Sequence, residues 1–327
     1  MNEIEFEARH NAEWAQLHAA VSAPKKGAAP GSAPAEEVPR RFRRAVAQLA
    51  LARDRQYRTS LLDRLHTLVT TTHLAVHGAR AARGRGIVAE LRRFIFETLP
   101  RAVRSEWPFV LVAGLTFFGP MLGILATILW YPDFVYYLVS PEQLSMVQSM
   151  YAPGNARLGA GREADTDVAM LGFYIANNVQ IDLQCVAGGI FFGLGTLFFL
   201  LYNAVFLGAI AGHLTGIGYG ATFWGFVSGH SAFELTGVVL SGAAGLRIGR
   251  ALVAPGRRTR AAALREAGRP AAILMYGAAM LTTAAAVIEA FWSSRVSIPL
   301  ELKVAFGLAM FAVTFVYFAF GGRSRGS

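Results

Sequence analysis

Long stretches without charged residues constrain the fold of this chain more than any other feature. Residues 109–130 and most of 169–320 are nearly free of Asp, Glu, Lys and Arg. A helix needs about 20 apolar residues to cross the hydrocarbon core of a bilayer, and only regular, internally hydrogen-bonded backbone is stable there. Charged residues make up only 16% of the chain, against about 25% in soluble domains. The sequence therefore predicts an all-α, polytopic membrane helix bundle.

Six membrane spans are predicted, at about 109–130, 169–184, 187–212, 223–249, 271–292 and 300–320. The span at 169–184 is short and amide-rich, and hydropathy alone does not decide whether it crosses. Positive charge decides it, because Lys and Arg near spans stay in the cytoplasm. Residues 1–108 hold 18 Lys and Arg, and residues 246–270 hold seven Arg. An even number of crossings must separate these regions, so the amide-rich segment should cross and both termini should be cytoplasmic.

The first 108 residues are predicted to form a basic, helical region on the cytoplasmic side. Within it, residues 23–39 are rich in Pro, Ala and Gly and are typical of a flexible linker. Residues 87–106 have one apolar face and carry Arg92 and Arg93 on another. This pattern, directly before a span, predicts a helix that lies in the membrane interface.

The remaining boundaries agree with this topology. Four tryptophans lie within a few residues of predicted span ends, as residues of an interfacial aromatic belt do: Trp107, Trp130, Trp224 and Trp292. The acidic segment 131–168 becomes the main outer loop, and residues 321–327 a cytoplasmic tail. Heavy use of Ala, Arg and Gly indicates a GC-rich bacterial gene, so the expected location is the bacterial inner membrane.

Glycines recur at four-residue spacing in the predicted spans. The pairs are Gly189/Gly193, Gly208/Gly212, Gly225/Gly229 and Gly245/Gly249. In a bilayer such pairs allow helix backbones to approach closely. Packing within one subunit is the favoured interpretation, and contact between copies in a homo-oligomer is the alternative.

The stretch "SGHSAFEL" (228–235) places two ionisable residues in an otherwise apolar span. His230 and Glu234 lie one turn apart on a single helix face, in line with small residues further along. Such a face is directed towards protein or trapped water, because ionisable groups are unfavourable against lipid. A buried structural pair is the favoured interpretation. A proton or metal site is the alternative.

Other polar residues join this list of buried candidates. Asn203 and Glu289 are expected at about the depth of His230. Asn177, Asn178 and Asp182 require the amide-rich span to be enclosed by other helices, with Asp182 near its cytoplasmic end, away from His230.

The chain contains no catalytic triad, zinc-binding motif, nucleotide-binding fingerprint or nucleic-acid-binding signature. We therefore predict a protein that is not an enzyme, has no cofactor or dedicated metal motif, and does not bind nucleic acid. The lipid bilayer is its first predicted partner.

Three stretches together carry a family resemblance: "FYIANNVQIDLQCVAGGIFFGLGTLFFLLYNAVFLGAIAG", "GHSAFELTGVVLSGAAGLRIG" and "IEAFWSS". They resemble the stage II sporulation protein M family. The matching positions are Asn178, Gly193, Asn203, Gly208, His230, Glu234 and Glu289. The resemblance implies a membrane subunit that recruits and localises peptidoglycan-degrading partners and is not itself the hydrolase.

Two functions from different classes are thus expected. The first, implied by the resemblance, is a non-enzymatic membrane scaffold for partners that remodel the cell envelope. The second is a membrane transport or permease subunit, either ion-coupled or similar to an ABC-2 permease. It would use an enclosed polar path through His230, Glu234, Asn178 and Asp182.

The predicted topology can be tested with reporter fusions or cysteine accessibility. Residue 60, residue 258 and the C-terminus should be cytoplasmic, and residue 150 should be outside, because seven Arg near 258 resist translocation. If residues near 258 are labelled from outside, the amide-rich segment does not cross.

Overall fold

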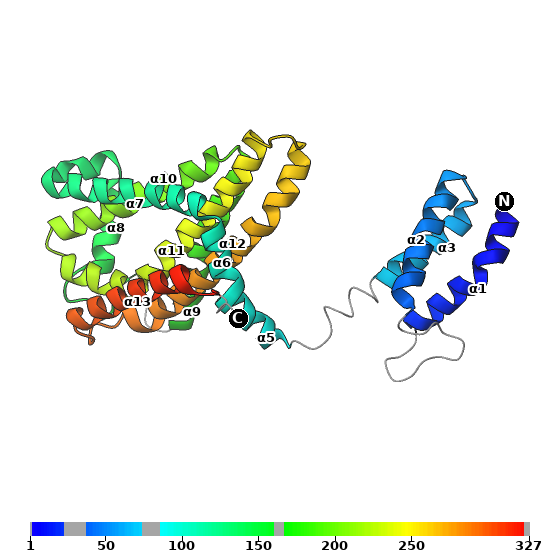
Figure 1. Cartoon of the computed structure of the whole chain (residues 1–327). Coiled ribbons are helices and arrows are strands. Elements are labelled where there is room, and N and C mark those ends of the chain that lie inside the picture. Colours follow the sequence, from blue (N-terminus) through cyan, green and yellow to red (C-terminus); the bar gives the residue numbers. More distant parts are fainter. Residues whose placement is uncertain (1, 23–36, 74–85, 160–166, 324–327) are drawn as a thin grey trace. The chain divides into compact units, whose positions relative to one another are not determined.

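The computed structural model describes residues 2–22, 37–73, 86–159 and 167–323 (Figure 1). The chain divides into two compact units, residues 1–90 and residues 91–327. Among the described residues nearly all regular structure is helical, and the only extended pairing is an isolated bridge between Arg157 and Arg295. The predicted all-α fold is confirmed.

The described residues up to 73 form α1 (Glu3–Ser22), α2 (Val38–Asp54) and α3 (Thr59–His73) of the first unit. Their apolar faces enclose a core that includes Phe6, Trp14 and Leu65, each at most 2% exposed. The expected linker at 23–39 overlaps α2 by two residues, because α2 begins at Val38; residues 23–36 lie outside the described ones.

Ion pairs at the rim join α1 to the other helices of this unit. Glu3 Oε1 lies 2.6 Å from Arg58 Nε, and Glu7 Oε1 lies 3.1 Å from Arg64 Nη1. The hydrogen bond from Arg58 lowers the pKa of Glu3. Exposed pairs contribute little to stability, so the apolar core is what holds the three helices together.

The helix predicted at 87–106 follows as three uninterrupted segments: α5 (Ile87–Arg93), the π-helical η2 (Phe94–Thr98) and α6 (Leu99–Ser105). From residue 91 onwards it belongs to the second unit. Arg101 Nε and Arg104 Nη1 donate to the carbonyl oxygens of Gly322 and Phe318, at 2.6 and 2.8 Å. Arg92 and Arg93 are exposed. The basic helix is therefore fastened to the C-terminal end of the last helix.

Five described stretches are long and apolar enough to cross a membrane. They are α7 (Trp107–Trp130), α10 (Leu194–Gly216), α11 (Gly220–Val253), α12 with the π-helical η5 (Arg260–Ile288 and Glu289–Ser293) and α13 (Leu300–Phe320). The chain is thus a multi-pass membrane protein.

The predicted sixth span corresponds to α9 (Asp167–Ala187), which is too polar to be among those five. It packs against α10, α11 and α12. A 21-residue helix can reach across the hydrocarbon core. Its crossing stays a prediction.

The expected span at 187–212 begins later than its hydropathy indicates. After α9 the chain forms a short 3₁₀ turn, η4 (Gly188–Ile190), and then Phe192 and Gly193 adopt positive φ values of 57° and 84°. Left-handed backbone ends a helix, so α10 starts only at Leu194. Hydropathy could not show this break because the residues on both sides are equally apolar.

The helix of this span also extends past the predicted span end at Gly212, because α10 continues through His213 to Gly216. Hydropathy favours an end at the first polar residue, but His213 is buried, and its Nε2 lies 2.8 Å from Gln148 Nε2. A polar side chain that has a partner inside the protein does not have to mark the end of a helix.

Gly208 and Gly212 lie where α10 packs on α7. A Cβ at Gly208 would overlap the carbonyl oxygen of Met121, and a Cβ at Gly212 would stand 3.0 Å from both Leu125 O and Ile128 Cβ. Gly212 is therefore a packing residue, but it lies inside α10 and not at its end. Both glycines make their close contacts within the chain.

The central helix of the bundle is α11, which packs against α7, α9, α10, α12 and α13 (Figure 1). Its Gly245 lies directly against α9 and α10. A Cβ there would stand less than 3.0 Å from the carbonyl oxygen of Cys185 and from Thr196 Oγ1. Gly249 meets the backbone of Gly193 in the same way. These glycines pack within the chain.

Two further glycines of the predicted pairs complete this comparison. A Cβ at Gly189 would overlap the backbone of Gly245, so Gly189 of η4, directly after α9, contributes to the same contact. Gly225 is different, because a Cβ there would make only ordinary contact with Leu300, at 3.4 Å. Close backbone approach is therefore not what Gly225 provides.

The predicted outer loop contains two helical segments, η3 (Pro132–Tyr137) and α8 (Pro141–Tyr151). Leu158 and Gly159 of this loop contact residues of the bundle. The Leu158 amide donates to the Ser294 carbonyl oxygen at 3.2 Å, and the backbone of Gly159 lies against the rings of Phe226 and Tyr174. The residues beneath this segment are those of the candidate site.

Replacement of Gly245 by Ala should destabilise the bundle by about 1–3 kcal/mol, because the added methyl group has no space. Gly123→Ala on α7 is the matched control, since a Cβ there meets nothing within 4 Å. Thermal unfolding in detergent measures both. Equal melting temperatures for the two variants would contradict the packing described for α11.

Candidate functional site: a buried His-Glu-Glu cluster

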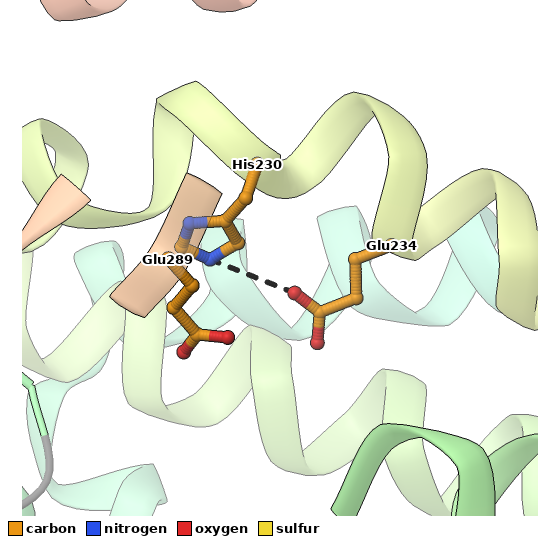
Figure 2. Close-up of side chains that lie close together, drawn as sticks. All are labelled: His230, Glu234 and Glu289. Carbon is orange, nitrogen blue, oxygen red and sulfur yellow. Dashed lines mark ion pairs between the residues drawn. The ribbon is translucent and has the colours of Figure 1, made fainter. Parts of the chain in front are cut away.

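Three side chains from two elements converge near one end of the bundle. His230 and Glu234 come from α11, and Glu289 opens η5. Figure 2 shows all three pointing toward one another. His230 Nε2 lies 3.5 Å from Glu234 Oε2. One ligand atom from each residue lies within 4.8 Å of the other two.

Local geometry explains why these residues meet. His230 and Glu234 are four residues apart, so they share a face of α11. Close contact of α11 with η5 depends on Gly229, where a Cβ would overlap the Trp292 ring. The π turn at η5 widens the helix at the point where Glu289 leaves it; such turns occur often at functional sites.

The imidazole is fixed on its far side. His230 Nδ1 lies 3.0 Å from Ser293 Oγ, and Lys303 Nζ donates to the Ser293 carbonyl oxygen at 2.8 Å. The edge of Phe226 packs on the ring, with centroids 5.3 Å apart. These contacts direct Nε2 towards the carboxylates.

Lys303 is only 2% exposed and was not among the sequence candidates. Lys303 lies in the first two turns of α13. Besides Glu301, it is the single charged residue of that span. An ionisable residue inside a predicted span is by default a functional candidate, so the signal was present.

Burial differs across the cluster. The side chain of His230 is 4% exposed, whereas that of Glu234 is 26% exposed. Tyr151 at the end of α8 is close to the same carboxylates: burial raises its pKa, and the charge of Glu289 raises it further. One side of the cluster is therefore enclosed, and the Glu234 side is open.

Asp182 lies nearer to this cluster than expected. Its Oδ2 accepts a hydrogen bond from Thr282 Oγ1 at 3.0 Å, and Thr282 packs against Gly237. Gly237 is three residues after Glu234, about 4.5 Å along the helix axis. Asp182 is thus level with the middle of α11 and closer to the cluster than expected, whereas its depth relative to the cytoplasmic side stays a prediction.

The amides divide into two groups. Asn178 is buried on α9, one turn before Asp182. Asn177 Nδ2 donates a hydrogen bond to Asn178 Oδ1 at 3.0 Å. Asn203 is different, because its amide donates to Phe199 O on its own helix at 2.8 Å. The structure aligns Asn178 with Asp182 but does not bring Asn203 to the cluster by any described hydrogen bond.

The tryptophans proposed for the membrane interface also differ. Trp107, Trp130 and Trp224 are exposed. Trp292 is half-buried and packs on Phe306, with ring centroids 4.7 Å apart. Trp292 therefore packs η5 against α11 at Gly229 and against α13 at Phe306.

Thr282→Val should destabilise the protein by about 1–3 kcal/mol, because it removes a donor from the buried Asp182 carboxyl group. The neighbouring Thr283 is exposed, and its hydroxyl bonds only to Ala279 O of its own helix. Thr283→Val should therefore change stability by less than about 0.5 kcal/mol. Chemical or thermal unfolding in detergent compares the two. Equal losses would mean that the Thr282 bond to Asp182 contributes nothing.

The chain was compared with known families, curated proteins and solved structures. A domain of unknown function, DUF8413, matches residues 4–78, which make up most of the first helical unit. No curated protein and no solved structure matches. The family Stage II sporulation protein M matches residues 110–294, which is more than half of the 327 residues and contains the whole cluster. The chain belongs to the Stage II sporulation protein M family.

Proposed function

We propose that this protein is a non-enzymatic integral membrane scaffold that recruits or organises partners that remodel the cell envelope, in particular peptidoglycan. The observation that carries the proposal is membership of the Stage II sporulation protein M family across the membrane bundle. The resemblance implies recruitment of peptidoglycan-degrading partners rather than hydrolysis. The proposed location is the bacterial inner membrane, with both termini in the cytoplasm.

Two features of the structure support a scaffold. The chain combines a membrane bundle with a second compact helical unit, residues 1–90, which offers a recognition surface of its own. In the bundle, the most apolar window of α11 is 61% buried, against 11% for α7 and 17% for α13. The outer helices thus present apolar faces that lipid, partner helices or a second copy can cover.

A membrane transport subunit is the second candidate. The observation in its favour is a polar series on α9 and α11 that comprises the buried Asn178, Asp182 and His230 and the partly buried Glu234. Enclosed ionisable groups in membrane helices often mark ion or proton pathways.

The scaffold proposal can be tested by cross-linking the tagged full-length protein in native membranes, followed by purification and identification of bound proteins. Peptidoglycan-remodelling proteins should be enriched over an unrelated multi-span protein, and they should lose their localisation in cells that lack this chain. Retained localisation together with no enrichment would contradict the scaffold.

Asp182→Asn separates the two candidates, because it changes the polar series without altering the outer helices. A scaffold should keep its partners in this variant. A transport subunit should show ion flux in proteoliposomes that the substitution abolishes. Thr283→Val is the control for general damage to the bundle, and gel filtration in detergent checks that both variants are folded.

A further inference from the structure

The His230, Glu234 and Glu289 side chains contribute one nitrogen and two carboxylate groups to one small volume. Imidazole nitrogen and carboxylate oxygen are ligands that divalent transition-metal ions prefer.

The spacing of the donors matches a metal site better than a hydrogen bond. The 3.5 Å between His230 Nε2 and Glu234 Oε2 is longer than a charge-assisted hydrogen bond, which is about 2.7–2.9 Å. Two ligands of a tetrahedral Zn²⁺ at about 2.0–2.2 Å from the ion stand roughly 3.3–3.5 Å apart. Glu289 has a flexible side chain and lies within 4.8 Å of both.

The contacts behind the imidazole have the arrangement found around metal-bound histidines. Such a histidine donates its second ring N–H to a neighbouring oxygen, which fixes the tautomer and the ring orientation. Here Ser293 Oγ lies 3.0 Å from Nδ1, and Lys303 holds the Ser293 backbone in place. An Nδ1–H that donates to Ser293 leaves the Nε2 lone pair directed towards the two carboxylates.

Glu234 is the least buried member of the cluster, with 26% of its side chain exposed. Three protein ligands leave one tetrahedral position free for water, as in zinc sites that exchange ligands.

From these four observations we propose that His230, Glu234 and Glu289 bind one divalent transition-metal ion. A mixed imidazole and carboxylate set suits Zn²⁺, Mn²⁺ or Fe²⁺, and Zn²⁺ binds most tightly among these three. The ion joins α11 to η5. The site is near Leu158 and Gly159, which contact Ser294 and Phe226. The proposal concerns the bundle itself and does not depend on the scaffold function.

The experiment uses full-length protein in detergent, stripped with a chelator and then titrated with ZnCl₂. Elemental analysis after desalting should give about one zinc per chain. At a hundredfold excess over Kd, the melting temperature should rise by about 5–10 °C. Wild-type stoichiometry is independent of any variant, so a variant that fails to fold leaves the test intact.

Glu289→Gln, Glu234→Gln and His230→Asn should each abolish stoichiometric zinc and the thermal shift. Two variants outside the cluster are matched controls. His213→Asn replaces another buried histidine, which contacts Gln148 at 2.8 Å, and Glu301→Gln replaces an exposed carboxylate in α13. Both should keep the zinc.

The proposal is overturned if stripped wild-type protein takes up no stoichiometric zinc and shows no thermal shift. In that case protons, or the nearby Lys303 ammonium, compensate the carboxylates. It is equally overturned if the three cluster variants retain zinc as well as the two controls do.

Discussion

The close approach of α11 to its neighbours is the contact on which the rest of the membrane unit depends. At Gly245 and Gly249 the helix lies directly on the carbonyl of Cys185 and the backbone of Gly193, at distances that leave no room for a Cβ. In a bilayer, where lipid is as apolar as a leucine side chain, such close packing is a main source of helix association. It also allows one helix to contact five others.

This packing determines where polar groups can be buried. At the level of Gly229 and Gly237, α11 is close enough to η5 and α12 for side chains on the two elements to meet. His230 of α11 reaches Ser293 of η5, and Thr282 of α12, which packs on Gly237, reaches Asp182 of α9. Larger residues at these glycines would separate the elements. Each buried polar group would then lose its partner, which is more unfavourable than the hydrogen bond is favourable.

The cluster and the N-terminal unit lie in separate parts of the chain. The cluster lies in the region that matches the Stage II sporulation protein M family, near Leu158 and Gly159, which contact Ser294 and Phe226. The helical unit of residues 1–90 has a separate core and a separate family match. Under the two proposals, a metal ion stabilises the bundle by joining α11 to η5, and partners bind the N-terminal unit or the apolar outer helices.

The sequence by itself determined the fold class, five of the apolar helices, the basic helix before the first span, and the shared face of His230 and Glu234. These features depend on composition and on the 3.6-residue period, which are local properties. Tertiary structure decided the rest: Glu289 and Ser293 meet His230, Lys303 supports Ser293, and Thr282 contacts both Asp182 and Gly237. His230 and Ser293 are 63 residues apart. Contacts over that separation depend on how the helices pack, and a single sequence carries no periodic signal for them.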